Sequence, residues 1–186
     1  IAMGLVVPPG SPVLTPEDLA GRPIAVSDKT GSYYVGYRML DGFMPWDAIR
    51  LQHVGHPPER IAALFDGSVD AAILMEPYIS LAEQRGARVV CQASYLGAEV
   101  SAGPVPSEVV DRYHHALRRA VADINADLPA FAARLIAAEG LERELPASAL
   151  NLGRLLYVPP TLYTEADYQA AAGWMARDSR NSRSAA

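Results

Sequence analysis

The sequence predicts an α/β fold in which helices cover a small, mostly parallel sheet. Within the first 97 residues, short apolar segments alternate with segments whose apolar residues recur at helical spacing. The connections between them are short and marked by Gly or Pro, which is typical of repeated strand–helix units. After residue 100 only helical patterns follow. We therefore expect one α/β layer and a separate group of helices.

The first half of the layer begins with an apolar run at residues 1–7 (IAMGLVV), which predicts a strand. Residues 15–18 (TPED) predict a helix start, because a capping hydroxyl precedes a proline and two acids near the positive end of the helix dipole. Residues 23–27 (PIAVS) predict the second strand. Helical spacing of apolar residues predicts a helix over 31–40.

The second half repeats this arrangement. Residues 50–54 (RLQHV) predict the third strand, and 57–66 a helix that begins at two prolines and ends before a glycine. The continuous apolar run 70–75 (DAAILM) is expected of a strand covered on both faces. A helix at 77–84 and a strand at 88–92 (RVVCQ) complete the layer.

Four helices are predicted in the second part of the chain, at 105–126, 128–139, 146–157 and 164–176. Their apolar faces have no strands of their own to cover. We therefore expect them to pack on a surface that this chain does not supply.

Composition narrows the classes of function. The formal net charge of -5 gives no reason to expect nucleic acid as a partner. Apolar runs end after about eight residues, which is too short for a membrane-spanning helix.

The single cysteine, Cys91, lies in a predicted strand and is expected to be a small buried residue, not a nucleophile. The four histidines lack metal-ligand spacing, so we expect no metal. The sequence also has no Gly-rich phosphate loop, no G-x-S-x-G motif and no paired-carboxylate pattern, so we expect no cofactor and no catalytic residue.

The strongest candidate binding segment follows the second strand. There, small hydroxyl residues and a glycine lead into a helix N-terminus, whose first N–H groups lack intrahelical partners and whose dipole favours negative charge. This predicts a cradle for a small anion. The alternative is that Thr30 or Ser32 only caps the helix. The predicted contacts are Ser27, Lys29, Thr30, Gly31, Ser32 and Tyr33.

A second candidate segment, Glu76, Pro77 and Tyr78, follows the central apolar strand, at the edge where open α/β sheets bind ligands. Glu76 would accept a hydrogen bond from a ligand amine or hydroxyl, or pair with Lys29. Its alternative role is a solvated acid at a helix start. Tyr33, Tyr34 and Tyr78 lie near the same rim and would stack on a flat ligand, with core packing as the alternative for one or two of them. A carboxylate beside an anion cradle predicts an anionic or zwitterionic ligand.

Several of these segments together resemble a known family. TPEDLAGRPIAV, TGSYY, ERIAALFDGSVDAAILMEPY and QRGARVV are similar to periplasmic solute-binding proteins of ABC transporters, in the NMT1/THI5-like branch for sulfonate, taurine, nitrate and thiamine precursors. The most specific part is Asp66-Gly67, Asp70-Ala71-Ala72 and Glu76-Pro77 at matching spacing. EVVDRYHHALRRAVADINADLPAFA resembles the long helix of the family that returns to its first lobe. The resemblance covers residues 4–176.

The resemblance implies a periplasmic-binding-protein type II-like fold, truncated at its N-terminus, in which two lobes close on a ligand. It divides the chain into a hinge strand with a remnant of lobe 1 (1–11), the α/β lobe 2 (12–97), a return hinge (98–105), C-terminal helices of a partly missing lobe 1 (106–178), and a disordered tail (179–186).

The function that the resemblance implies is the substrate-binding component of an ABC importer. Such a protein is a monomer, periplasmic or lipid-anchored outside the cell, without membrane insertion. It delivers a small anionic or zwitterionic solute (sulfonate, taurine, nitrate or pyrimidine-like) to a permease. Three alternatives remain open: an enzyme on the same fold (a desulfinase or a thiamine-pyrimidine synthase), the effector-binding domain of a LysR-type regulator, and a non-functional fragment.

Overall fold

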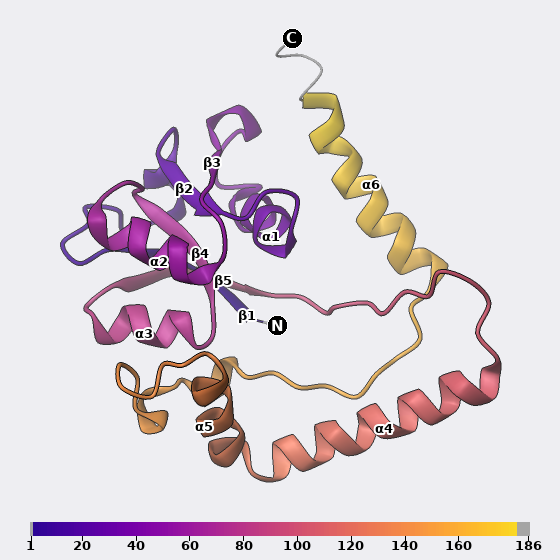
Figure 1. Cartoon of the computed structure of the whole chain (residues 1–186). Helices are drawn as coiled ribbons and strands as arrows, with labels where there is room; N and C mark the ends of the chain where they lie inside the picture. Colours follow the sequence, from indigo (N-terminus) through magenta and orange to yellow (C-terminus); the bar gives the residue numbers. More distant parts are fainter. Residues whose placement is uncertain (1, 182–186) are drawn as a thin grey trace. The chain divides into compact units, whose positions relative to one another are not determined.

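The computed structural model describes residues 2–181 and contains a five-stranded mixed sheet (Figure 1). Its strands lie in the order β3-β2-β4-β1-β5. Their bounds are Ala2–Val7 (β1), Pro23–Val26 (β2), Arg50–His53 (β3), Ala71–Met75 (β4) and Arg88–Ser94 (β5). All five predicted strands are confirmed, each to within two residues.

Strand directions agree with a mostly parallel sheet. β2 is parallel to both of its neighbours, β3 and β4. β1 is the exception, because it runs antiparallel to β4 and β5, between which it lies. All six residues of β1 are buried, which explains why its sequence is an unbroken apolar run.

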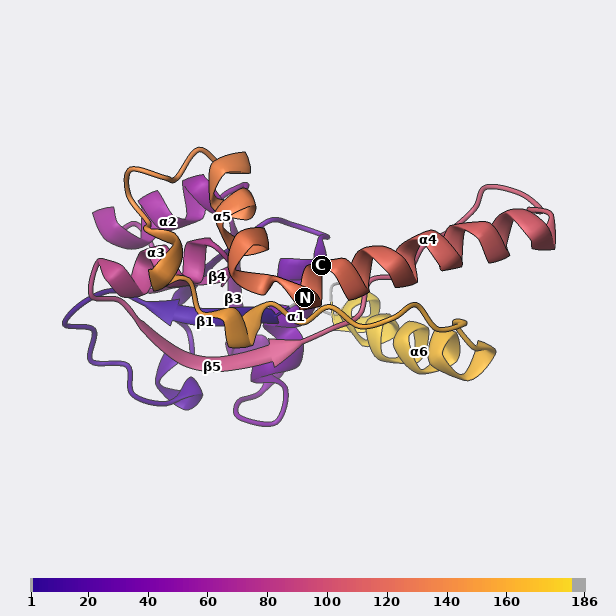
Figure 2. The ribbon, with the colours of Figure 1, turned by 90° about the horizontal axis from the view of Figure 1, so that it is seen from below.

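Side chains from the sheet enter two cores, one on each face. Figure 2 shows the sheet between the helices that cover these cores. Leu5 and Ile73 belong to the core covered by α1 (Gly31–Leu40). Val6 and Leu74, their neighbours in the chain, belong to the core covered by α2 (Pro57–Asp66) and α3 (Tyr78–Gln84). This alternation follows from the two-residue period of a strand.

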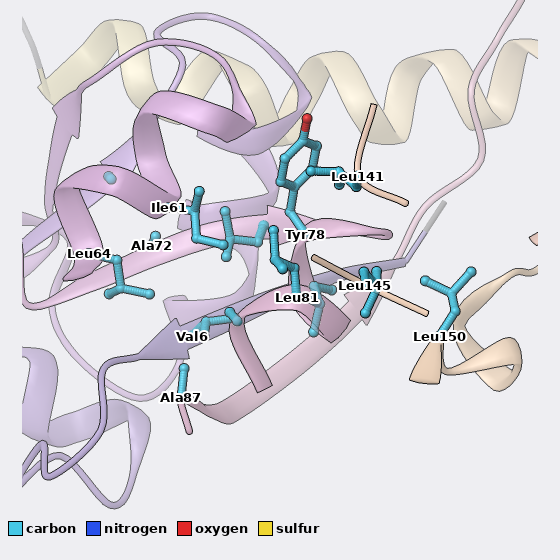
Figure 3. Close-up of a cluster of buried hydrophobic side chains, with 14 of the residues drawn as sticks. Val6, Ile61, Leu64, Ala72, Tyr78, Leu81, Ala87, Leu141, Leu145 and Leu150 are labelled. Carbon is cyan, nitrogen blue, oxygen red and sulfur yellow. The ribbon is translucent and has the colours of Figure 1, made fainter. Parts of the chain in front are cut away.

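Helix α5 (Leu128–Ala138) and the segment after it complete the second core. Figure 3 shows Leu141, Leu145 and Leu150 of that segment within the cluster. Ile136 is 2% exposed, and Leu145 and Leu150 are also buried in this cluster. The expectation that the apolar face of this helix needs a surface outside the chain is therefore wrong. The sheet and α3 supply that surface.

The helix predicted over 146–157 is also wrong. The structure has two short 3₁₀ turns there, η3 (Ala147–Ala149) and η4 (Leu152–Arg154). The Asn151 side chain accepts a hydrogen bond of 3.1 Å from the Gly153 N–H. Asparagine that bonds its own backbone in this way favours a turn over a continuous helix. Two further 3₁₀ turns, η1 (Pro16–Leu19) and η2 (Trp46–Ala48), precede β2 and β3.

The chain divides into two compact units, and the elements above belong to the first, residues 1–96 and 124–157. The second unit contains most of α4 (Ser107–Ala126) and all of α6 (Glu165–Asn181). No residue along the whole of α4, which the structure describes in full, is buried. Within residues 2–181, no helix combines the length and apolar character that crossing a bilayer requires.

Helix α6 begins at a reciprocal cap. The Thr164 hydroxyl donates to Asp167 at 2.6 Å and accepts from the Asp167 N–H at 3.2 Å. The predicted helix over 164–176 is confirmed and continues to Asn181. Of the predicted disordered tail at 179–186, residues 182–186 lie outside the described residues. The predicted boundaries of lobes and hinges stay predictions.

Candidate functional site

The two segments predicted to bind a ligand follow adjacent strands. β2 and β4 are parallel neighbours, so both end at the same edge of the sheet. From there the chain enters α1 on one face and α3 on the other. In open α/β sheets, ligands bind at such a point, where the connections turn to opposite faces. Residues 27–33 and 76–78 therefore share one edge, which we call the switch-point edge.

The segment after β2 is organised by its hydroxyl groups. The Ser32 Oγ accepts a hydrogen bond of 2.9 Å from the Ser27 N–H, and the Thr30 hydroxyl donates to the Ser27 carbonyl at 2.7 Å. Thr30 Oγ1 and Ser32 Oγ lie 3.0 Å apart. Thr30 occupies the N-cap position of α1 but makes no side-chain capping bond there. The first-turn N–H groups of α1 therefore carry no side-chain cap, as an anion site requires. The Tyr33 N–H bonds the Thr30 carbonyl at 3.1 Å, so the N–H groups of Gly31 and Ser32 are the ones open to a ligand.

His53 contacts this segment from the neighbouring strand β3. It ends β3, where its register partner in β2 is Val26. Its Nδ1 accepts a hydrogen bond of 3.0 Å from the Asp28 N–H, so the neutral ring carries its proton on Nε2. Lys29 next to it is exposed and has a left-handed backbone with φ of 54°. No sequence pattern pointed to His53 as part of this segment, because its place here depends on the parallel pairing of β2 with β3.

Gly31 lies against Tyr95, which directly follows β5. A Cβ atom at position 31 would lie 2.8 Å from the Tyr95 hydroxyl oxygen and 3.6 Å from the Met3 methyl group. Any larger residue would therefore have to displace the tyrosine. Burial raises the pKa of Tyr95 above its ordinary value. No sequence pattern pointed to Tyr95, because the approach of this tyrosine to α1 depends on the order of the strands in the sheet.

Tyr33 packs among other aromatic rings on α1. Its ring is partly buried and lies edge-to-face against Tyr34 and Tyr37, with centroids 5.2 Å and 5.1 Å away. Tyr37 in turn stacks on Trp46 at 4.9 Å. Tyr33 is thus part of a packed cluster as well as a neighbour of the cradle.

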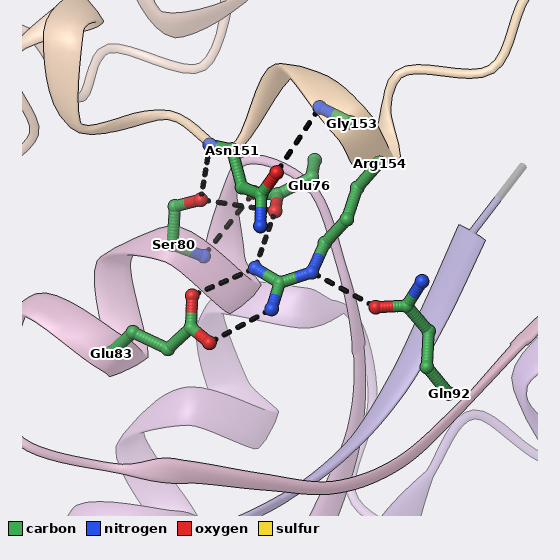
Figure 4. A network of polar contacts seen from close by, with 7 residues as sticks. All are labelled: Glu76, Ser80, Glu83, Gln92, Asn151, Gly153 and Arg154. Atoms are coloured by element: carbon green, nitrogen blue, oxygen red, sulfur yellow. Dashed lines mark hydrogen bonds and ion pairs between the residues drawn. The ribbon is translucent and has the colours of Figure 1, made fainter.

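The Glu76 carboxylate is almost fully buried, with 4% of its side chain exposed. It accepts hydrogen bonds from the Ser80 hydroxyl at 2.9 Å, the Ser80 N–H at 3.2 Å and Arg154 Nη1 at 3.1 Å (Figure 4). Burial raises the pKa of Glu76 and outweighs these contacts with Ser80 and Arg154, which lower it. The cationic partner of Glu76 is thus Arg154 instead of Lys29.

Arg154 comes from η4, in the segment where a continuous helix was predicted. It makes two parallel hydrogen bonds to the Glu83 carboxylate, at 2.7 Å and 2.8 Å, and a third from Nε to Gln92 at 2.9 Å. Only 10% of its side chain is exposed, and the pairing with Glu83, then with Glu76, raises its pKa. The two partners Arg154 and Glu76 are 78 residues apart, so no local pattern connects them.

The remaining two predicted contacts, Pro77 and Tyr78, lie in the core. Pro77 is buried, and Tyr78 is 5% exposed, within the apolar cluster that α5 completes. The Tyr78 hydroxyl donates to Glu139 at 2.9 Å. Burial, then the contact with Glu139, raises the pKa of Tyr78 to about 12. Its ring does not reach the exposed rim where stacking on a ligand was expected.

Beside Glu76 lies a mostly apolar pocket of about 250 Å³. Its walls come from the start of β1, the end of β4, α5 and the segment after η4. They include Met75, Leu135, Leu155 and Tyr157, with Glu76 and Glu139 as acidic members. Glu76 thus belongs both to the switch-point edge and to a wall of this pocket.

Nucleophilic and metal chemistry have little support among the described residues. Burial raises the pKa of Cys91 to about 11, so its thiolate is a minor species at neutral pH. Within residues 2–181, no group of three or more His, Cys, Asp or Glu side chains is placed to hold a metal ion.

Comparisons with known proteins place this fold. No protein-family model and no curated protein matches the sequence. The alkanesulfonate-binding protein SsuA from Xanthomonas axonopodis pv. citri, bound to MOPS, matches with a TM-score of 0.72 and 20% identity, over 90% of this chain and 60% of that protein. The periplasmic aliphatic sulphonate binding protein SsuA from Escherichia coli matches with a TM-score of 0.62 and 20% identity, over 98% of this chain and 64% of that protein.

The chain therefore spans slightly less than two thirds of the length of these neighbours. The expected α/β fold of the periplasmic-binding-protein type II class is confirmed, as a match to part of each neighbour. At this level of identity the comparison concerns fold alone.

Proposed function

We propose that this chain is the part of a solute-binding protein that holds a small anion at the N-terminus of α1. The observation that carries the proposal is the α1 N-terminus at the switch-point edge. The hydroxyls of Thr30 and Ser32 bond the end of β2 and leave the first turn without a side-chain cap. An anion there would accept backbone N–H bonds and gain from the helix dipole.

The magnitudes are sufficient for a useful affinity. Each charge-assisted hydrogen bond contributes about 1.5–3 kcal/mol. Three such bonds supply a large share of the roughly 8 kcal/mol of a micromolar site. In a two-lobed protein the facing lobe would provide the remaining contacts and exclude water.

Sulfonates are the ligand class that we propose first. The two structural neighbours are described as binding alkanesulfonates or aliphatic sulfonates, and the Xanthomonas protein holds MOPS, itself a sulfonate. Taurine, nitrate and pyrimidine-like solutes are the alternatives. Delivery to the permease of an ABC importer, a monomeric state and a location in the periplasm, or on a lipid anchor outside the cell, belong to the same proposal.

A binding role is favoured over an enzymatic one by the state of Cys91. A desulfinase that used this thiol as a nucleophile would need it ionised. Burial, which raises its pKa to about 11, opposes that ionisation.

The test is isothermal titration of the full-length protein with ethanesulfonate, MOPS, taurine, nitrate and an aminopyrimidine. We expect a sulfonate to bind with a Kd below about 100 μM, which corresponds to roughly 5–6 kcal/mol. Thr30→Val and Ser32→Ala should each weaken binding about tenfold or more, roughly the contribution of one hydrogen bond, because each removes a hydroxyl bond that holds the segment before α1 in place.

The matched control is Ser68→Ala, which removes an exposed hydroxyl bonded only to its neighbour Asp66, after α2. It should leave affinity unchanged. If no compound binds below that limit, or if Thr30→Val and Ser32→Ala bind like Ser68→Ala, the assignment of the site to α1 is wrong.

A further inference from the structure

We infer that Arg154, by pairing with the Glu76 carboxylate, determines the charge class of the ligand. The site therefore takes a simple anion in preference to a zwitterion that carries an amine. This inference rests on the proposed function of the same edge and names its substrate class. It replaces the expectation, from sequence, that Glu76 meets a ligand amine.

Most hydrogen-bond acceptor positions of the Glu76 carboxylate are already occupied. A carboxylate has about four lone-pair positions for hydrogen bonds. Three bonds already reach it, two from Ser80 and one from Arg154. With 4% of the side chain exposed, little of this carboxylate faces solvent or an incoming amine. A ligand amine at this edge would therefore lose water without gaining a free carboxylate.

Arg154 is fixed in place. Its guanidinium bonds three separate parts of the fold: Glu76 directly after β4, Glu83 in α3 and Gln92 in β5. The Glu83 contact is bidentate, which suits the planar fork of arginine and is not available to lysine. To reach Glu76, an amine would have to break this arrangement as a whole. Figure 4 shows these partners converging on the one guanidinium.

The charge of Glu76 also affects which ligand the site prefers. Without Arg154, the ionised form of Glu76 would be an unpaired negative charge at the same edge of the sheet as the α1 N-terminus. Such a charge repels an anion and attracts an ammonium group. Lys29, the cation nearest in sequence to the cradle, is exposed and is not the partner of Glu76. The neutralisation of Glu76 by Arg154 thus favours anions, and the occupation of three of the acceptor positions of Glu76 disfavours amines.

Ethanesulfonate and taurine are suitable probes, because they differ only by the taurine ammonium group. We expect the unmodified protein to bind ethanesulfonate at least tenfold more tightly than taurine. Arg154→Met should release Glu76 and shift the ratio of the two dissociation constants at least tenfold towards taurine. The double variant Arg154→Met/Glu76→Gln should return the ratio to near its original value, because the Glu76 charge is then gone, whereas Glu83 loses Arg154 in both variants.

A second measurement does not depend on the stability of the Arg154 variant. Glu76→Gln alone keeps the buried shape of the side chain and should change taurine affinity less than threefold. A tenfold loss of taurine binding in this variant would show that Glu76 contacts the amine directly and would overturn the inference. Arg85→Ala, which removes an exposed ion pair with Glu144, is the control for loss of an arginine and should not move the ratio.

The outcomes separate the two levels of the argument. If the unmodified protein binds neither probe, the proposed function fails. If it binds ethanesulfonate but binds taurine as well or better, or if Arg154→Met leaves the ratio unchanged, the proposed function stands and the role of Arg154 is wrong.

Discussion

The Ser32 Oγ accepts a hydrogen bond of 2.9 Å from the N–H of Ser27, and thereby joins the first turn of α1 to the end of β2. Ser32 is buried, so its hydroxyl cannot readily exchange this bond for one to water. The geometry of the proposed anion site therefore depends on a contact that also stabilises the fold.

Replacing this serine tests that dependence. We expect Ser32→Ala to lower the free energy of unfolding by about 1–3 kcal/mol, because it leaves the Ser27 N–H without its acceptor. Ser32→Thr retains the hydroxyl and should recover part of the loss. Urea unfolding followed by circular dichroism measures both variants. Equal stability of Ser32→Ala and the unmodified protein would contradict the buried bond.

The contact between Gly31 and Tyr95 gives a second prediction. A Cβ at position 31 would lie 2.8 Å from the Tyr95 hydroxyl, so Gly31→Ala should cost about 1–3 kcal/mol, as overpacking does elsewhere. Gly31→Ala/Tyr95→Phe should recover part of this cost, because the nearest remaining ring atom lies at 3.3 Å. Gly97→Ala is the control, since a Cβ there meets nothing within 4 Å. If Gly31→Ala is no worse than Gly97→Ala, the tyrosine does not approach α1 as described.

Packing of α5 on the α/β layer gives a third prediction. Ile136→Ala removes a side chain that is 2% exposed and should lower the free energy of unfolding by about 2–5 kcal/mol. Val109→Ala on α4 changes a side chain that is 47% exposed and should stay within about 0.5 kcal/mol. Chemical denaturation of both variants provides the comparison. A cost for Ile136→Ala as small as that for Val109→Ala would show that α5 does not belong to the core.

Sequence patterns could predict the five strands because each has a local end signal and all except β3, with the sequence RLQH, are mainly apolar. β1 and β4 are covered on both faces, and their sequences lack polar interruptions for that reason. The two binding segments could also be predicted to share an edge, since both follow strands in the same repeated unit. These are properties of short stretches of chain and their connections.

What the sequence did not predict depends on contacts between distant residues. The helical period of α5 predicts an apolar face but does not say what covers it. The pairing of Arg154 with Glu76, and the approach of Tyr95 to Gly31, follow only once the strand order is known. The segment 146–157 has helical spacing, but the Asn151 side chain hydrogen-bonds the backbone locally. The leucines of this segment pack in the core without forming a helix.

The ionisation of Tyr78 gives a fourth prediction, on how stability depends on pH. Its pKa in the folded protein is about 12, whereas an unfolded tyrosine ionises near about 10. A raised folded pKa means that the stabilising contribution is complete below pH 10 and is lost as the pH rises towards 12. Near pH 8, Tyr78→Phe should be less stable than the unmodified protein by about 1 kcal/mol, the contribution of the bond to Glu139.

That difference should narrow by about 1 kcal/mol between pH 8 and pH 11, because only the unmodified protein loses stability by ionising this hydroxyl. Urea unfolding at several pH values, with tyrosinate absorbance at each, would measure it. Glu139→Gln should retain part of the pH dependence, since burial is the larger cause of the shift and the carboxylate the smaller one. If the curves for the unmodified protein and Tyr78→Phe stay parallel up to pH 11, Tyr78 does not lie in the core between α3 and α5.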